Sequence, residues 1–138
     1  MNLRVVLDDG ARMPERAHEC DAGADLFTPS YAFVKPGQSA TIDTGVHIEI
    51  PDGYVGLIKA KSGLNVNFDL TCTGVIDAGY TGSIKVKLYN HGRMAHAFRV
   101  GEKVAQILIV PIVCCGFELV DALDETERGD GGFGSTGV

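Results

Sequence analysis

Residues 74–90 read GVIDAGYTGSIKVKLYN, and this stretch decides how the chain folds. From Ile84 to Leu88 every second residue is apolar, and Lys85, Lys87 and Tyr89 follow these apolar positions. This alternation predicts a β-strand with one buried face and one exposed face. Glycine-bearing turns connect the strand to the apolar residues just before it, so the stretch is expected to form a β-hairpin.

The turn of this predicted hairpin carries one carboxylate, Asp77, and one phenol, Tyr80. A hairpin would hold both side chains on a stiff support, from which a catalytic group benefits. The alternative is structural, with Asp77 as an ordinary turn residue and Tyr80 as a packed aromatic ring. The stretch by itself favours neither interpretation.

The chain has 138 residues, which suits one domain (1–138) with a core of its own. Its apolar fraction of 45% is ordinary for a globular protein, and its net charge is −6. A nucleic-acid-binding protein usually carries a basic stripe, which this sequence lacks, so no nucleic-acid partner is expected. No signal peptide and no apolar run of roughly 20 residues is present. We therefore expect a cytoplasmic protein without a membrane partner.

The cysteines show no Cys-x-x-Cys spacing and are Cys20, Cys72, Cys114 and Cys115. This spacing argues against a zinc site. Cys114 and Cys115 stand at the end of an apolar strand pattern, so we expect them to be buried thiols.

Short apolar segments separated by turn signals recur along the chain. They are Leu3–Leu7, Ala24–Phe27, Tyr31–Val34, Ala40–Ile42, Val46–Ile50, Tyr54–Lys59 and Val104–Val110. Turns are expected at Pro36–Gly37 and Pro51–Gly53, and one short helix is expected to begin with Ser62 as its N-cap. This spacing predicts an all-β sandwich or barrel. We expect its β-core (1–120) to end with Phe117–Val120.

Residues 121–138 differ in composition, with an acidic connector followed by a glycine-rich arm. Flexible glycine-rich ends are usually linkers. Arg128 and Phe133 argue for a function instead, because a guanidinium can bind two phosphate oxygens and a phenyl ring offers a flat face to a base. The glycines from Gly129 to Gly134 match G-x-G-x-x-G formally. No strand leads into them and no helix can follow, so this is not a Rossmann motif.

Five stretches, taken in order, resemble the five motifs of the trimeric deoxyuridine triphosphatases (dUTPases). They are Asp21–Leu26, Ala60–Leu64, Gly74–Gly82, Gly101–Gln106 and Arg128–Gly137. The resemblance covers almost the whole chain, and the third and fifth motifs are highly specific. Two positions depart from the usual pattern. Lys61 stands where the second motif usually has Arg, which keeps the charge but loses the bidentate fork, and Thr81 stands where the third motif often has Arg or Gln.

The resemblance implies a distorted jelly-roll fold and a homotrimer with active sites shared between subunits. It also implies hydrolysis of dUTP to dUMP and pyrophosphate with Mg²⁺, which keeps uracil out of DNA and supplies dUMP for thymidylate synthesis. Asp77 is then similar to the general base that activates water for attack on the α-phosphorus. Asp25 is similar to the carboxylate that holds the metal through water.

The same resemblance implies three groups of substrate-binding residues. The phosphate cradle consists of Lys61, Ser62, Gly63 and Gln106. The nucleoside is held by Tyr80 beneath the deoxyribose and by backbone groups around Cys72, Gly74 and Lys85 at the uracil edge. The arm supplies Phe133 over the uracil ring, and Arg128, Gly134, Ser135 and Thr136 toward the γ-phosphate.

Two other functions stay open at this point. A dCTP deaminase-type enzyme of the same fold would release ammonia instead of pyrophosphate, and it would not need Asp77 together with an Arg- and Gly-rich arm. A non-catalytic nucleotide-binding or regulatory protein would keep the fold without the chemistry. The presence of Asp77, Tyr80 and Arg128 argues against that loss.

Overall fold

The computed structural model describes residues 1–137 and contains short strands with one helix among them. The strands are β1 (Val5–Leu7), β2 (Gly23–Phe27), β3 (Ala32–Val34), β4 (Ser39–Asp43), β5 (Val46–Ile48), β6 (Tyr54–Lys59), β7 (Leu70–Thr71), β8 (Thr73–Ile76), β9 (Lys85–Asn90), β10 (His96–Phe98) and β11 (Lys103–Pro111). The helix, α1, spans Ser62–Phe68. Val138, the last residue of the predicted domain and arm, lies outside the described residues. The strands expected from Leu3 to Val110 are confirmed, with small shifts of their ends.

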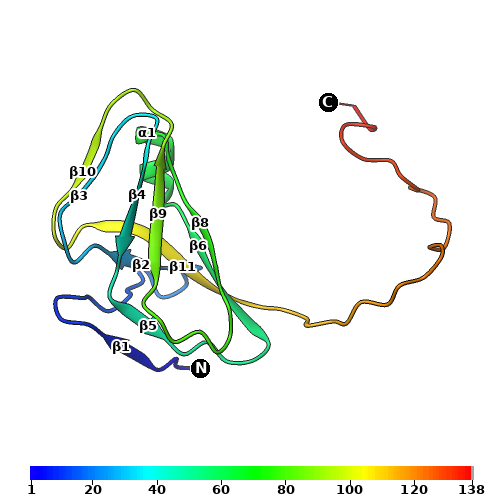
Figure 1. Ribbon diagram of the computed structural model, residues 1–138, viewed down its shortest axis with the longest axis horizontal. Helices are drawn as coiled ribbons and strands as arrows, with labels where there is room; N and C mark the ends of the chain where they lie inside the picture. The colour runs from blue at the N-terminus through cyan, green and yellow to red at the C-terminus, as the bar shows by residue number, and fades with distance from the viewer. Residues whose placement is uncertain (138) are drawn as a thin grey trace.

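The strands form four small antiparallel sheets (Figure 1). One sheet has the order β2-β11-β6-β8 and another the order β4-β9-β7, while β1 pairs with β5 and β3 with β10. Within residues 1–137 no sheet closes into a barrel. The all-β prediction is therefore confirmed, in the form of open sheets around a common interior.

That interior is one hydrophobic core to which all four sheets contribute. It includes Leu26, Ile58 and Ile107 from the four-stranded sheet and Val86 and Leu88 from the three-stranded sheet, all of them buried. The central position of β11 explains its nearly continuous apolar sequence, because it is hydrogen-bonded to β2 on one side and to β6 on the other.

The alternation in β9 is confirmed, but the predicted hairpin is wrong. Val86 and Leu88 are buried while Lys85 and Lys87 are exposed. β8 pairs with β6, whereas β9 pairs with β4 and β7, so the two strands belong to different sheets. The cause lies at Ile84, whose N–H donates to the Val46 carbonyl at 2.9 Å and whose carbonyl accepts from the Thr44 N–H at 3.0 Å. The connecting loop therefore crosses from one sheet to the other.

The predicted helix is present, but its N-cap is Lys61 and not Ser62. Ser62 is the first helical residue, and no side-chain hydrogen bond caps this end. The helix ends at Phe68, and its C-cap, Asp69, adopts the left-handed conformation with φ 55. The turn at Pro36–Gly37 is confirmed, because the Gln38 N–H donates to the Lys35 carbonyl at 3.1 Å and Gly37 has φ 69.

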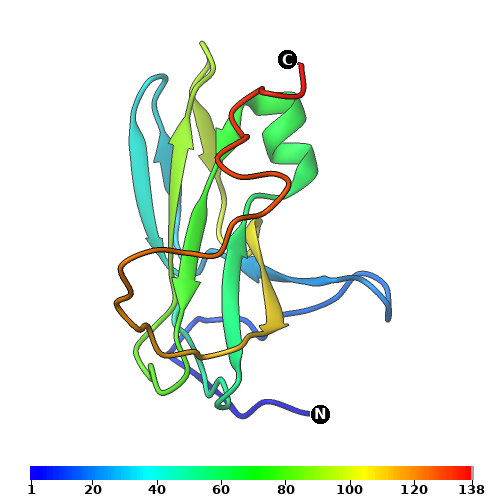
Figure 2. The same cartoon turned by 90° about the vertical axis from the view of Figure 1, so that its right-hand side faces the viewer.

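The regular structure ends at Pro111, before residue 120, where the sequence placed the end of the β-core. The Ile112 N–H still donates to the Gly53 carbonyl at 2.8 Å, and the chain then leaves the body as an extended arm (Figure 1). In Figure 2 the same arm, orange to red, faces the viewer and passes in front of the strands. Phe117 is 99% exposed and Leu119 100% exposed. The prediction that Cys114 and Cys115 are buried is wrong, since both thiols are free and exposed on this arm. They follow the end of β11, so no neighbouring strand covers them.

Within residues 1–137 no helix combines the length and the apolar character needed to cross a lipid bilayer.

Candidate active site

The loop between β8 and β9 folds back on itself and fixes the ring of Tyr80. The Tyr80 N–H donates to the Asp77 carbonyl at 3.2 Å, and its hydroxyl donates to the Ser83 carbonyl at 3.0 Å. The ring lies against Gly82, where an added Cβ would come within 2.4 Å of the tyrosine oxygen. A residue with a side chain at position 82 would therefore displace the ring, which explains the glycine there.

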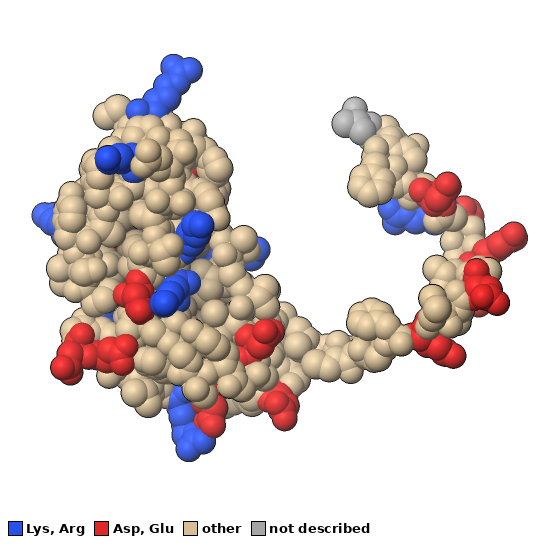
Figure 3. Space-filling model, in the orientation of Figure 1, with Lys and Arg blue, Asp and Glu red and all other residues tan. Residues whose placement is uncertain are grey.

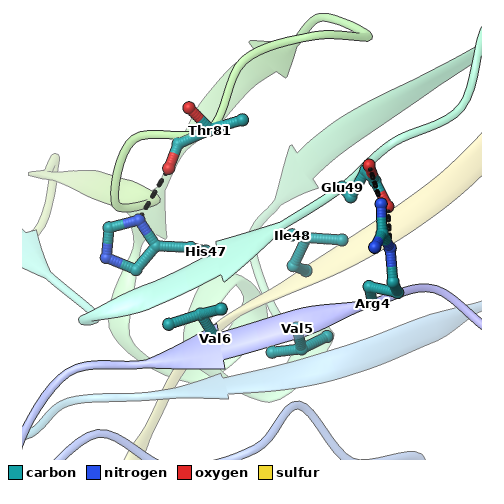
Figure 4. A pocket seen from close by; sticks show the side chains of 7 residues that line it. All are labelled: Arg4, Val5, Val6, His47, Ile48, Glu49 and Thr81. Carbon is teal, nitrogen blue, oxygen red and sulfur yellow. Dashed lines mark hydrogen bonds and ion pairs between the residues drawn. The ribbon is translucent and has the colours of Figure 1, made fainter.

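Two side chains from neighbouring segments hold this loop in place. His47 of β5 places Nδ1 at 2.7 Å from the Thr81 carbonyl (Figure 4). Its Nε2 lies 3.0 Å from an Asp8 carboxylate oxygen. Both partners are acceptors, so only the protonated imidazole donates to both. The Thr81 carbonyl and then Asp8 accordingly raise the pKa of His47. The second side chain that holds the loop is Asp43 of β4. It accepts a hydrogen bond from the Ser83 hydroxyl, and this bond lowers the pKa of the Asp43 carboxylate.

A cavity of about 270 Å³ opens along the same loop. Its lining residues are Val75, Ile76, Asp77, Tyr80, Ser83 and Lys85. The Asp77 carboxylate is exposed to solvent here. The cavity thus combines apolar walls with one carboxylate that can accept a proton from water and one ammonium that can meet a polar ligand edge.

Of the residues predicted for the uracil edge, Lys85 lines this cavity, whereas Cys72 and Gly74 are not among its lining residues. Cys72 is buried, and burial raises the pKa of its thiol to about 11, so the thiolate is not available at neutral pH. Gly74 lies against Ile58, because a Cβ added to this glycine would be 3.3 Å from the Ile58 Cβ. Their backbone groups, rather than their side chains, are therefore the groups with which a ligand could pair.

A cluster of three charged side chains lies where β2, the start of α1 and the start of β11 meet. It consists of Asp25, Lys61 and Lys103, and we call it the Asp25 cluster. Asp25 is 3% exposed and accepts from both ammonium groups, with Lys103 Nζ at 2.7 Å from Oδ2 and Lys61 Nζ on Oδ1. Burial raises the pKa of Asp25, but hydrogen bonds and charge from Lys103 and Lys61 outweigh it and hold the pKa below its usual range. The carboxylate is therefore ionised, and the cluster carries one net positive charge.

Gln106 lies next to this cluster because β11 pairs residue 106 with Asp25 of β2. Its side-chain amide donates to the Ala60 carbonyl at 3.0 Å, which fixes it beside the start of α1. Gly23 makes this possible, since a Cβ there would lie 2.2 Å from Gln106 Oε1. Ser62 and Gly63 are exposed at the same helix start. The structure therefore brings the whole predicted phosphate cradle together.

The arm holds the remaining predicted residues, away from both groups. Arg128 Nε donates to the Gly131 carbonyl at 2.9 Å, and the Ser135 N–H donates to the Gly132 carbonyl at 3.0 Å. Phe133 has φ 50 and a fully exposed ring. Among the described residues no hydrogen bond or ion pair joins 113–137 to 1–111, and Figure 3 shows the arm standing clear of the body.

The cavity and the Asp25 cluster also lie at different ends of one ladder. β6 pairs Lys59 with Thr73 near the cluster, and Gly56 with Ile76 just before Asp77. Three residue steps along a strand correspond to roughly 10 Å. One chain therefore presents three separate parts: the Asp77 cavity, the Asp25 cluster with Gln106, and the arm.

A family model for dUTPase matches residues 9–137, which is almost the whole chain. The chain belongs to the dUTPase family. Its relatives include the deoxyuridine 5'-triphosphate nucleotidohydrolase of Clostridium tetani, 43% identical over 135 residues that cover 96% of this chain and 93% of the relative. The protein of the same name from Cutibacterium acnes is 45% identical over 130 residues, covering 91% and 86%.

Solved dUTPase structures share the fold as well. A variant of the Staphylococcus bacteriophage 80alpha dUTPase with dUpNHpp superposes with a TM-score of 0.93 at 34% identity, covering 99% of each chain. A variant dUTPase from phage phi11 of S. aureus, with a TM-score of 0.82 at 32% identity, covers 88% of this chain and 98% of the other. That structure is described as revealing the coordination of a structural Mg(II) ion. The resemblance to the dUTPase family is thus confirmed.

Two residues that organise this candidate site, Lys103 and His47, were assigned no role from the sequence alone. Lys103 belongs to the fourth motif, yet only the pairing of β2 with β11 shows that it shares a carboxylate with Lys61. His47 is one polar position on a strand, and its contact with Thr81 spans 34 positions of the sequence. Neither contact leaves a local signal in the sequence.

Proposed function

We propose that this member of the dUTPase family hydrolyses dUTP to dUMP and pyrophosphate by attack of water on the α-phosphorus, with Asp77 as the general base. The observation that carries the proposal is the Asp77 carboxylate, exposed over a cavity whose other walls include Tyr80 and Lys85. An ionised carboxylate beside a bound phosphate can take a proton from the attacking water. The curated relatives are named nucleotidohydrolases, which fits this reaction and not a deamination.

The Asp77 cavity would bind the nucleoside. The Tyr80 ring, fixed by its bond to Ser83, would lie beneath the deoxyribose and leave no room for a 2′-hydroxyl. Backbone groups around Cys72 and Gly74, with Lys85, would pair with the uracil edge. The solved 80alpha dUTPase with dUpNHpp shows that a relative binds a dUTP analogue.

The phosphates would lie against the predicted cradle and the arm. Lys61, Ser62, Gly63 and Gln106 would contact the phosphate oxygens. From the arm, Arg128, Gly134, Ser135 and Thr136 would bind the γ-phosphate, and Phe133 would cover the uracil. Donors placed where charge develops on the leaving pyrophosphate lower the barrier most.

Mg²⁺ is the cofactor that we propose. No group of three His, Cys, Asp or Glu side chains within residues 1–137 could hold a metal by itself. This fits Mg²⁺, which keeps several waters and takes its other ligands largely from substrate phosphates. Asp25, an ionised oxygen donor beside the phosphate cradle, would contact it through water. The ion would neutralise charge on the departing pyrophosphate.

We further propose a homotrimer of distorted jelly rolls in which subunits share each site. One chain holds the Asp77 cavity and the proposed phosphate cradle apart, and residues 113–137 of its arm form no hydrogen bond or ion pair with residues 1–111. The arm also exposes the large apolar side chains of Phe117, Leu119 and Phe133. Packing them against another protein surface would remove this apolar area from water. A second and a third copy would supply the missing parts.

The reaction can be tested by hydrolysing dUTP in H₂¹⁸O. Attack at the α-phosphorus places ¹⁸O in dUMP and leaves pyrophosphate unlabelled, and we expect this distribution by mass spectrometry. Label in pyrophosphate would place the attack at the β-phosphorus and contradict the mechanism. Release of ammonia from dCTP in a parallel reaction would instead support the deaminase alternative.

A further inference from the structure

The Asp25 cluster contains one more ammonium group than its carboxylate needs. Asp25 is buried, and a buried carboxylate is costly unless it is paired with a cation. One lysine satisfies this need, yet two are present, with Lys103 on Oδ2 and Lys61 on Oδ1. Asp25 therefore has two cationic partners, although one would balance its charge.

The two lysines differ in their surroundings. Lys61 precedes α1 directly, beside Ser62 and Gly63 of the proposed phosphate cradle, and its side chain is 29% exposed. Lys103 opens β11, and its side chain is 47% exposed. Lys61 is thus the ammonium next to the cradle, while Lys103 approaches the carboxylate from the strand that pairs with β2.

We propose that Lys103 is a positioning residue that keeps Asp25 paired and so releases Lys61 to bind the substrate phosphates. In the structure both ammonium groups lie on Asp25. When a triphosphate arrives, Lys61 turns toward it, and Lys103 keeps a direct ion pair with the buried carboxylate, which the Mg²⁺ proposed above would contact only through water. This inference rests on the phosphate-binding role proposed above for Lys61.

The test measures the Kd of dUpNHpp in Mg²⁺ for the full-length protein and several variants. Lys103→Met should raise this Kd by about 10–100-fold, the loss expected when one charged hydrogen bond to the ligand is no longer available. Lys103→Arg, which restores the cation, should bind nearly as the wild type does. Lys35→Met is the matched control, because it removes the same charge from an exposed lysine of the same chain and should leave the Kd unchanged.

A double-mutant cycle with Asp25→Asn separates this role from a direct contact. Without the carboxylate charge Lys61 is already free, so Lys103→Met should have little further effect in the Asp25→Asn background. An undiminished effect in that background would mean that Lys103 binds phosphate itself and would overturn the inference. An unchanged Kd for Lys103→Met in the wild-type background would also overturn it.

Two further variants keep the outcome interpretable. Lys61→Met should weaken dUpNHpp at least as much as Lys103→Met does. If Lys61→Met leaves the Kd unchanged, the proposed phosphate role of Lys61 fails and the inference fails with it. If only Lys61→Met weakens binding, the inference alone fails. Should Lys103→Met not fold, Lys103→Gln replaces it, since glutamine can still donate to Asp25 but supplies no charge, and the same weakening is expected.

Discussion

Gly23→Ala is expected to lower the activity by displacing Gln106, one side chain of the proposed phosphate cradle. The added Cβ would lie 2.2 Å from Gln106 Oε1, 2.9 Å from Cδ and 3.1 Å from Cβ of the same residue. Ordinary van der Waals contact begins at 3.4 Å, so the amide end must move by roughly 1 Å. This movement breaks its hydrogen bond to the Ala60 carbonyl.

The two consequences differ in size. Losing one hydrogen bond should lower the free energy of unfolding by about 0.5–1.5 kcal/mol. Misplacing a substrate-positioning group by about 1 Å can lower the rate by about 10²-fold. We therefore expect kcat/KM for dUTP to fall by up to about two orders of magnitude while the protein stays folded.

Pyrophosphate release gives kcat/KM, and thermal unfolding gives the stability. Gly116→Ala is the matched control, because its Cβ would meet nothing within 4 Å. In the Gln106→Ala background the new methyl group has room, so Gly23→Ala should cost little more. The reasoning is refuted if Gly23→Ala retains the wild-type kcat/KM, or if its effect is undiminished in the Gln106→Ala background.

Three further predictions concern the Asp77 loop. Asp77→Asn should lower kcat for dUTP by about 10²–10⁴-fold while the Kd of dUpNHpp stays near the wild-type value, and near-normal turnover would exclude Asp77 as the base. Tyr80→Ala should raise kcat/KM for UTP relative to dUTP, because the space beneath C2′ opens; an unchanged ratio would place sugar discrimination elsewhere. The raised pKa of His47 means that its stabilisation is complete below about pH 6.5 and is lost as the pH rises through the folded-state pKa. The Tm difference between the wild type and His47→Ala should therefore be larger at about pH 5.5 than at about pH 9, and equal differences would contradict a role for the imidazolium.

The strands could be predicted because their signals are local. The alternation from Ile84 to Leu88 and the apolar run from Val104 to Val110 specify one buried face and one central strand, and both are confirmed. The pairing could not be predicted in the same way. A glycine-rich connection looks like a hairpin turn, but the hydrogen bonds of Ile84 to Thr44 and Val46 draw β9 onto another sheet.

In the candidate site, too, the residues could be predicted from local motifs, whereas their contacts depend on strand pairing. The motifs contain Asp77, Tyr80, Lys61 and Gln106, and the structure brings Lys61 and Gln106 together around Asp25. The redundant pairing of Asp25 with Lys103 depends on the register between β2 and β11, which the sequence does not reveal. The burial predicted for Cys114 failed for a related reason, since an apolar pattern does not tell whether a neighbouring strand covers it.

The proposal that subunits share the active site can be tested most directly by complementation between two inactive variants, Asp77→Asn and a chain truncated after Glu127. Each variant alone should form an inactive or nearly inactive assembly, because one lacks the base and the other lacks the arm from Arg128 onward. The two are unfolded together and refolded as a mixture, and sizing with mass spectrometry confirms that mixed assemblies form. The control refolds each variant separately and then pools them.

We predict that dUTP hydrolysis reappears in the co-refolded mixture but not in the pooled control. Some sites would then combine the intact Asp77 of a truncated chain with the intact arm of an Asp77→Asn chain. If arm and base instead come from one chain, no mixture contains a complete site. Mixed assemblies that are confirmed to form and yet remain as inactive as their parents would contradict the account.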